Sequence, residues 1–352
     1  MAQAMFAQAL KRVAVKPPLL GRLCVYRPVA TTMSARVVIV NAARVDFDKK
    51  LNLAALEAVA QVTSHDVSAG EEIAVRADGH QVVITKEIPV TADVIAKFPD
   101  SVKLIAEAGT GYNNIDIQAA RARGITVCNV PAYSNDAVAQ LVVTFLLNFS
   151  CSMVPQQRML MKGDKSNFTK HLQVPHFEAG GKTLGLIGGG GTIGSKVTEI
   201  ALTLGLTILI SSRNPKPSAD PRVQIVTLDE LLAQSDFISI HCPLTDATRH
   251  LIDTAALGKM KPSAFIINTA RGAIVKEGDL IAALQAGTIA GAGLDVQDPE
   301  PPAEDSPLYT LDNVILTPHI GWRRLETRQR LMDMVAENVA AFLRGSPTNV
   351  VN

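Results

Sequence analysis

The chain has 352 residues, of which 47% are apolar and 19% are charged, and its formal net charge is +1 at pH 7. This length favours two domains over one core, and the near-neutral charge argues against a nucleic-acid partner held through phosphate contacts. The longest apolar run, residues 141–154, is too short to span a bilayer, so we expect a buried helix there and no membrane segment. The four cysteines lack metal-ligand or disulfide-framework spacing, and the sequence predicts no metal site.

The first 35 residues differ in composition from the rest of the chain. No acidic residue occurs before Asp46, basic residues recur from Lys11 onward, and residues 5–15 can form a helix with one apolar and one basic side. This composition is typical of an organellar transit peptide, and the scarcity of hydroxyl residues before Thr31 favours a mitochondrial over a chloroplast address. A basic tail without a targeting function, on a cytoplasmic protein, is the alternative.

From Val37 onward, short apolar runs alternate with segments of helical periodicity. Apolar strands that alternate with helices indicate parallel sheets, and the alternation restarts at Lys182, so we expect two such sheets. The strands expected in the first sheet are 36–43, 81–85, 102–109 and 125–131. The strands expected in the second sheet are 182–188, 206–212, 224–228, 236–244, 264–270, 289–296 and 314–320. The helices expected between these strands are 51–61, 115–124, 194–205, 228–234, 253–260 and 277–287.

Residues 182–198 predict a strand, a glycine-rich turn and the start of a helix, which together can bind a dinucleotide pyrophosphate. Gly189, Gly191 and Gly194 fit the pattern G-x-G-x-x-G. The first glycine permits a tight turn and the second lets the backbone approach the pyrophosphate. The third lets the helix pack closely, so that its N-terminal amides face the phosphates. Because residues 188–191 are all glycine, the register of the pattern is open by one residue.

The next expected strand ends without the carboxylate that would hold the ribose hydroxyls of NAD. Ser212 stands where that acid would be, with Ser211 before it and Arg213 after it. A carboxylate would repel a 2′-phosphate, whereas a hydroxyl and a guanidinium can bind one. The sequence therefore predicts NADPH as the cofactor, and a site that also accepts NADH is the alternative.

Three segments that end or follow strands of the second sheet each carry one polar group suited to the same reaction. Arg271 can bind a carboxylate through two parallel hydrogen bonds, and His319 can give or take a proton. Glu300 can hydrogen-bond the other imidazole nitrogen, which fixes the tautomer and favours the imidazolium. Taken alone, these residues could be a surface ion pair, a loop acid and a helix N-terminal residue.

Together these segments resemble the D-isomer-specific 2-hydroxyacid dehydrogenases, from about Val37 to the last residue. The resemblance rests on GLIGGGGTIG, HCPLTDATRHLID, NTARG with KEGDL behind it, GLDV and TPH, which occur in that order. AGTGYNNIDIQAA, NVPAYSNDAVAQ and HIGW are most similar to the glycerate dehydrogenase, or hydroxypyruvate reductase, branch of the family. The glycine turn is one residue longer than the usual form of the family.

The resemblance implies roles for further residues. Arg271, Glu300 and His319 take the catalytic positions, with His319 as the general acid. The residues implied to surround the substrate are Thr110 and Gly111, through backbone amides on its carboxylate, together with Arg271 and Trp322 as a wall of the pocket. The residues implied to contact the cofactor are Thr192 and Ile193 at the pyrophosphate, His241, Pro243, Thr248, Thr269 and Ala270 on the adenosine and ribose side, and Asp295 at the nicotinamide carboxamide.

The resemblance also implies an α/β fold of two doubly wound parallel sheets. A Rossmann-type cofactor domain, residues 135–318, is then inserted into a flavodoxin-like substrate domain formed by residues 36–134 and 319–352, behind a targeting extension of residues 1–35. A homodimer through the cofactor domains is expected.

The expected reaction is the reduction of hydroxypyruvate to D-glycerate, and of glyoxylate to glycolate. A D-lactate dehydrogenase or broader 2-ketoacid reductase is the alternative enzyme. A nucleotide-sensing corepressor is the alternative of another class, and the complete Arg–Glu–His set and the basic leader both argue against it.

Overall fold

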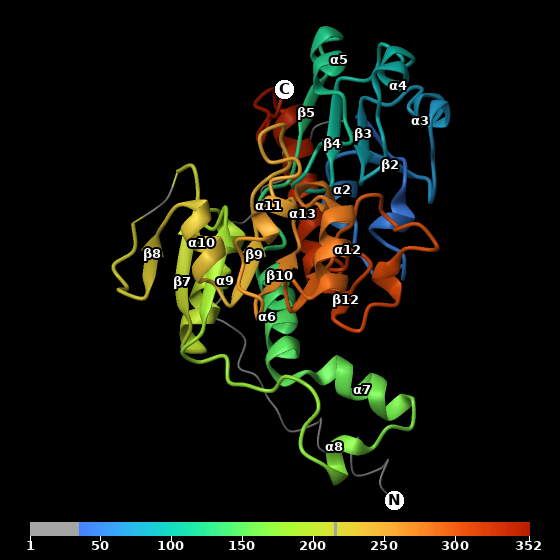
Figure 1. Ribbon diagram of the computed structural model, residues 1–352. Helices are drawn as coiled ribbons and strands as arrows, with labels where there is room; N and C mark the ends of the chain where they lie inside the picture. Colours follow the sequence, from blue (N-terminus) through green and yellow to red (C-terminus); the bar gives the residue numbers. More distant parts are fainter. Residues whose placement is uncertain (1–34, 215–216) are drawn as a thin grey trace, which may run out of the picture. The chain divides into compact units, whose positions relative to one another are not determined.

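The computed structural model of the chain describes residues 35–214 and 217–352, which form two all-parallel sheets with helices around them (Figure 1). The two sheets confirm the predicted α/β fold. The predicted targeting extension lies outside the described residues, apart from Ala35.

The first sheet has five strands in the order β2-β1-β3-β4-β5, which is the flavodoxin-like order. Its strands are β1 (Arg36–Ile39), β2 (Gln61–Ser64), β3 (Val82–Thr85), β4 (Leu104–Glu107) and β5 (Thr126–Cys128). β3 and β4 are buried along their whole length, as expected for continuous apolar runs in a parallel sheet. The sequence did not predict β2, an edge strand whose side chains are mostly exposed.

Helices cover both faces of the first sheet. They are α2 (Ala54–Glu57), α3 (Glu71–Arg76), α4 (Ala92–Ala96), α5 (Ile117–Ala122) and, from the end of the chain, α13 (Leu325–Leu343). Side chains alternate along β1, so that Val37 packs in one core with Leu331 of α13 while Val38 packs in another with Ile73 of α3. The C-terminal helix therefore belongs to the first sheet, although the whole second sheet precedes it in sequence.

The second sheet has seven strands in the order β12-β11-β10-β9-β6-β7-β8. Its strands are β6 (Thr183–Ile187), β7 (Thr207–Ser211), β8 (Val223–Ile225), β9 (Phe237–Ile240), β10 (Phe265–Asn268), β11 (Gly291–Leu294) and β12 (Val314–Leu316). Six of them follow the dinucleotide-binding order 3-2-1-4-5-6, and β12 extends the sheet beside β11. From β6 the strands are added first toward β8 and then, from β9 onward, on the other side of β6, and ligands bind at such a switch in strand order.

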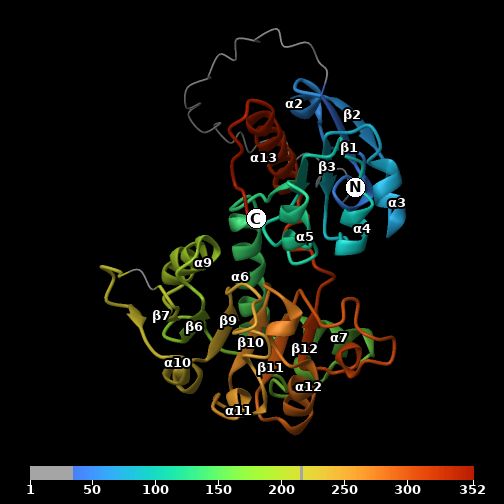
Figure 2. The same ribbon diagram turned by 90° about the horizontal axis from the view of Figure 1, so that it is seen from above.

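Helices also sandwich the second sheet. α6 (Asn135–Cys151) and α9 (Thr192–Thr203) share one core with its strands, and α10 (Leu228–Gln234), α11 (Thr254–Leu257) and α12 (Glu277–Ala286) share the other core (Figure 2). α6 packs so closely that a Cβ at Gly293 would lie 2.8 Å from Phe145 Cγ. The remaining helices are α7 (Met153–Met161), α8 (Ser166–Thr169) and the short 3₁₀ turns η1 (Ala42–Arg44), η2 (Gly272–Ile274) and η3 (Pro307–Tyr309).

The apolar run 141–154 was expected to be one buried helix, and its residues up to Cys151 lie in α6. The run continues past a break at Ser152 into α7, where Met153 is exposed, so the prediction was wrong for its last residues. No single helix of the described ranges is long and apolar enough to cross a membrane. α6 and α7 would match a span together in length and composition, but they bend by 62° at their junction. Nine residues of α6 are buried in the protein.

Candidate active site

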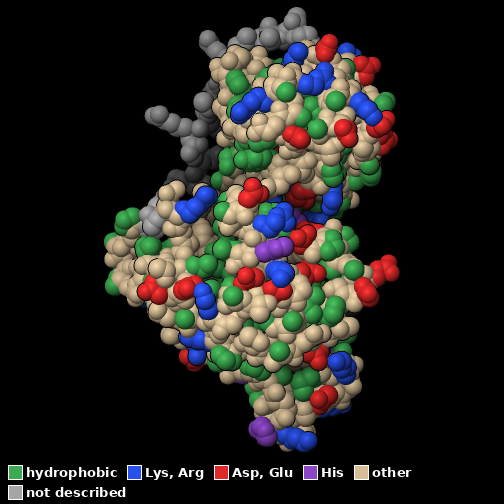
Figure 3. Space-filling model, turned by 45° about the horizontal axis from the view of Figure 1, so that its top comes forward, with side chains coloured by type: hydrophobic (Ala, Val, Ile, Leu, Met, Phe, Trp, Pro, Cys, Tyr) green, Lys and Arg blue, Asp and Glu red, His purple; other side chains and the backbone are tan. Residues whose placement is uncertain are grey.

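A cavity of about 650 Å³ is lined by loops that follow strands of both sheets. Figure 3 shows side chains of both charge signs, with a histidine among them, gathered around a hollow on one face of the molecule. The lining residues are Arg44, Glu87, Gly111, Asn113, Asn114, Arg271, Gln297, Glu300, Pro301, Pro302, Tyr309, Leu316, Thr317, Pro318, His319 and Arg323. The three predicted catalytic residues thus share one cavity.

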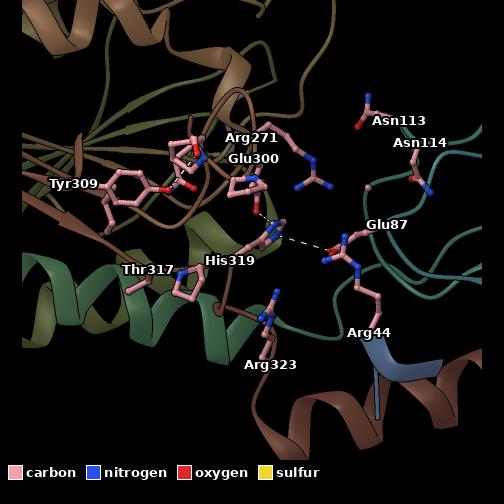
Figure 4. A pocket seen from close by; sticks show the side chains of 16 residues that line it. Arg44, Glu87, Asn113, Asn114, Arg271, Glu300, Tyr309, Thr317, His319 and Arg323 are labelled. Carbon is pink, nitrogen blue, oxygen red and sulfur yellow. Dashed lines mark hydrogen bonds and ion pairs between the residues drawn. The ribbon is translucent and has the colours of Figure 1, made fainter. Parts of the chain in front are cut away.

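His319 lies in the loop after β12 with one ring nitrogen tied to Glu300. Its Nδ1 is 2.8 Å from Glu300 Oε1, and Nε2 is left for the cavity (Figure 4). His319 has a φ of +52°, a left-handed conformation that histidine adopts more readily than most residues. Because an ionised carboxylate only accepts hydrogen bonds, Glu300 selects the form of the imidazole that carries a hydrogen on Nδ1.

Asp295, at the end of β11, holds the loop that carries His319. Its carboxylate accepts hydrogen bonds from Thr317 Oγ1 at 2.6 Å, from the Ile320 amide at 2.8 Å and from the Gly321 amide at 2.9 Å. Burial raises the pKa of Asp295, against the effect of these three donors. Its observed contacts position the histidine loop, and its predicted contact with the nicotinamide stays a prediction.

Arg271, after β10, meets the turn that follows β4 in the first sheet. A Cβ at Gly111 would lie 1.7 Å from Arg271 Nη2, so the guanidinium lies directly against that glycine. The Asn268 side chain fixes the backbone beneath Arg271, accepting from the Ala270 amide at 3.0 Å and donating to the Arg271 carbonyl at 2.9 Å. The arginine fork and the predicted carboxylate-binding turn are therefore side by side.

Two residues predicted to surround the substrate do not themselves line the cavity. Thr110 directly precedes the lining residue Gly111, and its hydroxyl donates to the Val130 carbonyl at 2.9 Å, while the predicted contact of its backbone amide with the substrate stays a prediction. Trp322 was expected to wall the pocket, but it is 4% exposed and packs in the core under α13. Lys86 Nζ lies 4.1 Å from the centre of its ring, so Trp322 supports the cavity from behind through this lysine.

A charged group formed by Lys86, Glu87 and Glu107 was not predicted from the sequence. Lys86 Nζ is 2.5 Å from Glu87 Oε1, and the Glu87 amide donates to Glu107 Oε1 at 3.1 Å. All three residues end or follow buried strands of the first sheet. Charged residues at the carboxyl ends of parallel strands are a signal that could have identified them.

A second cavity, of about 560 Å³, lies at the switch point of the second sheet. Of the predicted cofactor residues, it is lined by Gly191, Ser211, Ser212, Arg213, His241, Pro243 and Thr248. The lining also includes Gly188, Gly190 and Cys242, and none of the described lining residues is acidic. The predicted residues that do not line it are Gly189, Thr192, Ile193, Gly194, Thr269, Ala270 and Asp295.

The residues around this second cavity fit a bound dinucleotide. His241 Nε2, in the lining of the cavity, is buried and has no hydrogen-bond partner within the described ranges, and the same holds for Thr269 Oγ1 after β10, outside the lining. Burial lowers the pKa of His241 to about 4, which keeps the ring neutral at pH 7. Gly191 is the N-cap residue of α9, a helix of 12 residues with no side-chain cap on its N-terminal amides. Free amides at a helix N-terminus favour an anionic group such as a pyrophosphate.

The glycine turn fits the register Gly189, Gly191 and Gly194. A Cβ at Gly194 would lie 2.4 Å from the Gly189 carbonyl oxygen, so the helix packs directly on the turn there. The preceding Gly188 has a φ of +77°, and a Cβ on it would lie 2.6 Å from the Cys242 amide nitrogen. Gly188, the additional glycine of the turn, thus has a left-handed conformation and packs against the backbone that follows β9. A residue with a Cβ would not fit there.

The family described as D-isomer specific 2-hydroxyacid dehydrogenase, NAD binding domain, matches residues 143–321 of this chain. The chain belongs to this family. A hydroxypyruvate reductase of Blautia hydrogenotrophica is 36% identical over 304 residues, which are 84% of this chain and 94% of that protein. A glycerate dehydrogenase of Methylorubrum extorquens is 39% identical over 285 residues, which are 80% and 88% of the two proteins. These relatives confirm the resemblance found in the sequence.

Solved structures of the family share this architecture. A D-lactate dehydrogenase of Aquifex aeolicus, complexed with NAD and lactic acid, superposes with a TM-score of 0.76 at 28% identity. The superposition covers 88% of this chain and 96% of that protein. The family member described here is therefore a nicotinamide-dependent enzyme of small 2-hydroxy or 2-keto acids.

Proposed function

We propose that this dehydrogenase reduces hydroxypyruvate to D-glycerate, and glyoxylate to glycolate, with NADPH as the preferred cofactor. The observation that carries the proposal is the 2.8 Å hydrogen bond between His319 Nδ1 and Glu300 Oε1 in a cavity that also contains Arg271. One group of the cavity can deliver a proton and another can bind a carboxylate, as the reduction of a 2-keto acid requires. The names of the two relatives support hydroxypyruvate as the substrate.

Arg271 binds and orients the substrate in this mechanism. Its planar guanidinium can form two parallel hydrogen bonds to a carboxylate, and its position against Gly111 restricts how the substrate can approach. The same cation attracts electrons from the neighbouring ketone, which makes the carbonyl carbon a better hydride acceptor. The reduced nicotinamide, when bound, supplies the hydride.

His319 supplies the proton. Negative charge develops on the carbonyl oxygen during reduction, and a protonated Nε2 can donate to that oxygen. Glu300 holds the ring through Nδ1, so that Nε2 stays directed into the cavity, where the carbonyl oxygen would lie. In the oxidation of D-glycerate the same histidine accepts the proton from the hydroxyl group.

The choice of NADPH rests on the end of β7. Ser211, Ser212 and Arg213 line the second cavity, where no described lining residue is acidic. Arg213 is exposed, and no ion pair among the described residues involves it. A guanidinium of this kind can pair with a 2′-phosphate, which an acid in the same place would repel.

A steady-state assay tests the proposed function. Hydroxypyruvate, glyoxylate, pyruvate and phosphohydroxypyruvate are offered in turn, each with NADPH and with NADH, and kcat/KM is measured. We expect hydroxypyruvate with NADPH to give the highest value. A higher value for pyruvate would favour the D-lactate dehydrogenase alternative, and turnover of none of the four acids would refute the proposal.

We further propose that the enzyme acts in mitochondria. The support is the composition of residues 1–35, which contain no acid and five basic residues. A fluorescent protein fused behind residues 1–40 should accumulate in mitochondria and lose the leader by cleavage. Diffuse cytosolic fluorescence, or accumulation in chloroplasts of plant cells, would contradict this address.

A homodimer is the proposed assembly. Large apolar side chains are exposed along α7 and α8, including Met153, Met161 and Phe168, which is 78% exposed. Exposed apolar patches of this kind mark surfaces that are covered by a partner. Sedimentation of the wild type should give the mass of two chains, and the double substitution of Met161→Glu with Phe168→Glu should give that of one.

A further inference from the structure

Glu87 brings a second carboxylate to His319, on the side of the ring that faces the substrate. Its Oε1 lies 3.9 Å from His319 Nε2, whereas Glu300 binds the opposite nitrogen (Figure 4). A separation of 3.9 Å is too long for a direct hydrogen bond, so Nε2 stays able to donate to a ligand. Glu87 Oε1 pairs with Lys86 Nζ, and Oε2 can still accept a hydrogen bond from a ligand. The mechanism above uses Nε2 and leaves Glu87 without a role.

The structure holds Glu87 in this position at a cost. Its φ is +55°, a left-handed conformation that is unfavourable for glutamate, and its amide donates to the buried Glu107 carboxylate at 3.1 Å. Lys86 Nζ, 2.5 Å away, is itself buried against Trp322. Strained residues that several neighbours hold in place are concentrated at functional sites.

The same neighbours keep Glu87 ionised. Burial alone would raise its pKa, but the charges of Lys86 and His319 outweigh burial and lower the pKa of Glu87 to about 2. An ionised carboxylate accepts hydrogen bonds and cannot donate one. Glu87 therefore repels a second anionic group in the cavity and favours a hydrogen-bond donor.

We propose that Glu87 accepts a hydrogen bond from a hydroxyl group on C3 of the substrate and so selects 3-hydroxy-2-keto acids over unsubstituted ones. This inference rests on the proposed function. With the substrate carboxylate on Arg271 and its carbonyl oxygen on His319 Nε2, the next polar group along the chain is the one on C3. The carbonyl and the hydroxyl are on neighbouring carbons, as Nε2 and the Glu87 carboxylate are neighbours in the cavity. Hydroxypyruvate carries this hydroxyl, whereas pyruvate and glyoxylate lack it.

Two substrates of equal size test the assignment. Hydroxypyruvate and 2-oxobutanoate differ by the exchange of the C3 hydroxyl for a methyl group, so the ratio of their kcat/KM values isolates the hydrogen bond. A site built to bind a hydroxyl discriminates strongly against the analogue without it. Because the cavity is open to solvent, we expect wild type to prefer hydroxypyruvate by about 10-fold to 100-fold.

Glu87→Gln should lower this ratio about 10-fold, mainly through a loss of kcat/KM for hydroxypyruvate, because a neutral acceptor binds the hydroxyl more weakly. The double substitution of Lys86→Met with Glu87→Met removes both charges, leaves no lysine unpaired and should bring the ratio close to one. Asp48→Asn is the matched control, since Asp48 pairs with Arg328 of α13 outside the cavity lining and its loss should leave the ratio unchanged.

An equal loss for both substrates in the Glu87 variants would overturn the assignment and indicate an effect on His319 alone. An unchanged ratio in the double variant would also overturn it, while the enzyme's reductase activity still stood. If wild type reduces neither substrate with either cofactor, the proposed function fails and this inference fails with it.

Discussion

Two alanine substitutions in the glycine turn should have different effects. Gly194→Ala should lower the stability of the fold, whereas Gly191→Ala should weaken cofactor binding. At Gly194 the added methyl carbon would lie 2.4 Å from the Gly189 carbonyl oxygen and 2.6 Å from Gly189 Cα. Both are backbone atoms, so the clash cannot be relieved by the movement of a side chain. Helix α9 would have to shift away from the turn. At Gly191 the nearest atom would be the Gly188 carbonyl oxygen at 3.8 Å, an ordinary contact.

The magnitudes follow from these contacts. Forcing an extra methyl group into a packed site costs about 1–3 kcal/mol, and for a chain of this size each kcal/mol lowers the Tm by about 2–4 °C. Gly194→Ala should therefore lower the Tm by at least ~2 °C and up to ~12 °C. Gly191→Ala should change the Tm by about 1 °C or less, because two small effects oppose each other. Alanine caps a helix less well than glycine, but Gly191 has an extended conformation that alanine also adopts, and alanine lowers the entropy of the unfolded chain by about 0.4–1 kcal/mol in free energy. Its methyl group would instead occupy the space next to the free amides of α9, where we expect the pyrophosphate.

The assay combines thermal unfolding without ligand and calorimetric titration with NADPH. Gly191→Ala should bind NADPH at least about 10-fold more weakly while it unfolds like the wild type. Gly278→Ala is the control, since Gly278 is an exposed helix residue whose added Cβ would meet nothing within 4 Å. Wild-type affinity in Gly191→Ala, or a wild-type Tm in Gly194→Ala, would refute the assigned register of the turn.

Arg271→Lys should lower kcat/KM for hydroxypyruvate by about 10²-fold or more, because an ammonium group cannot form the two parallel bonds of a guanidinium. Equal activity of the lysine variant would rule out bidentate binding. In cofactor assays, wild type should prefer NADPH over NADH by about 10-fold to 100-fold in kcat/KM, and Ser212→Asp should reverse the preference. Arg213→Ala should weaken NADPH alone, and an equal loss for both cofactors would show that the arginine does not read the 2′-phosphate. Burial raises the pKa of Glu107 from 4.5 to about 7, so the folded chain binds this proton more tightly than the unfolded chain. The carboxyl therefore costs stability as pH rises from about 4.5 to 7, and the cost is complete above pH 7. Glu107→Gln should then raise the Tm relative to wild type more at pH 8 than at pH 5, and an equal difference at both pH values would contradict the raised pKa.

The sequence predicted most strands because a strand buried on both faces of a parallel sheet is a continuous apolar run. β3, with the sequence VVIT, and β10, with FIIN, are of this kind. β2 was missed because its sequence, QVTS, has one apolar residue. β2 is a strand because its backbone pairs with β1, and the sequence of four residues alone does not indicate that pairing.

The site was predictable to the extent that its residues belong to local motifs. NTARG and TPH identified Arg271 and His319 directly, and the structure brings both into one cavity. The contact between Lys86 and Trp322 joins segments far apart in the chain, and only the packing of α13 on the first sheet brings them together. For the same reason the sequence placed Trp322 in the wall of the pocket, although the structure buries it behind Lys86.

The most direct test of the central claim is the kcat of His319→Asn for hydroxypyruvate reduction, measured together with the Kd for NADPH. Asparagine tolerates the φ of +52° found at this position, so the loop should keep its conformation while the acid is lost. If His319 is the general acid, kcat should fall by about 10²-fold to 10⁴-fold while the Kd for NADPH changes by less than about 2-fold. A kcat close to that of the wild type would contradict the mechanism.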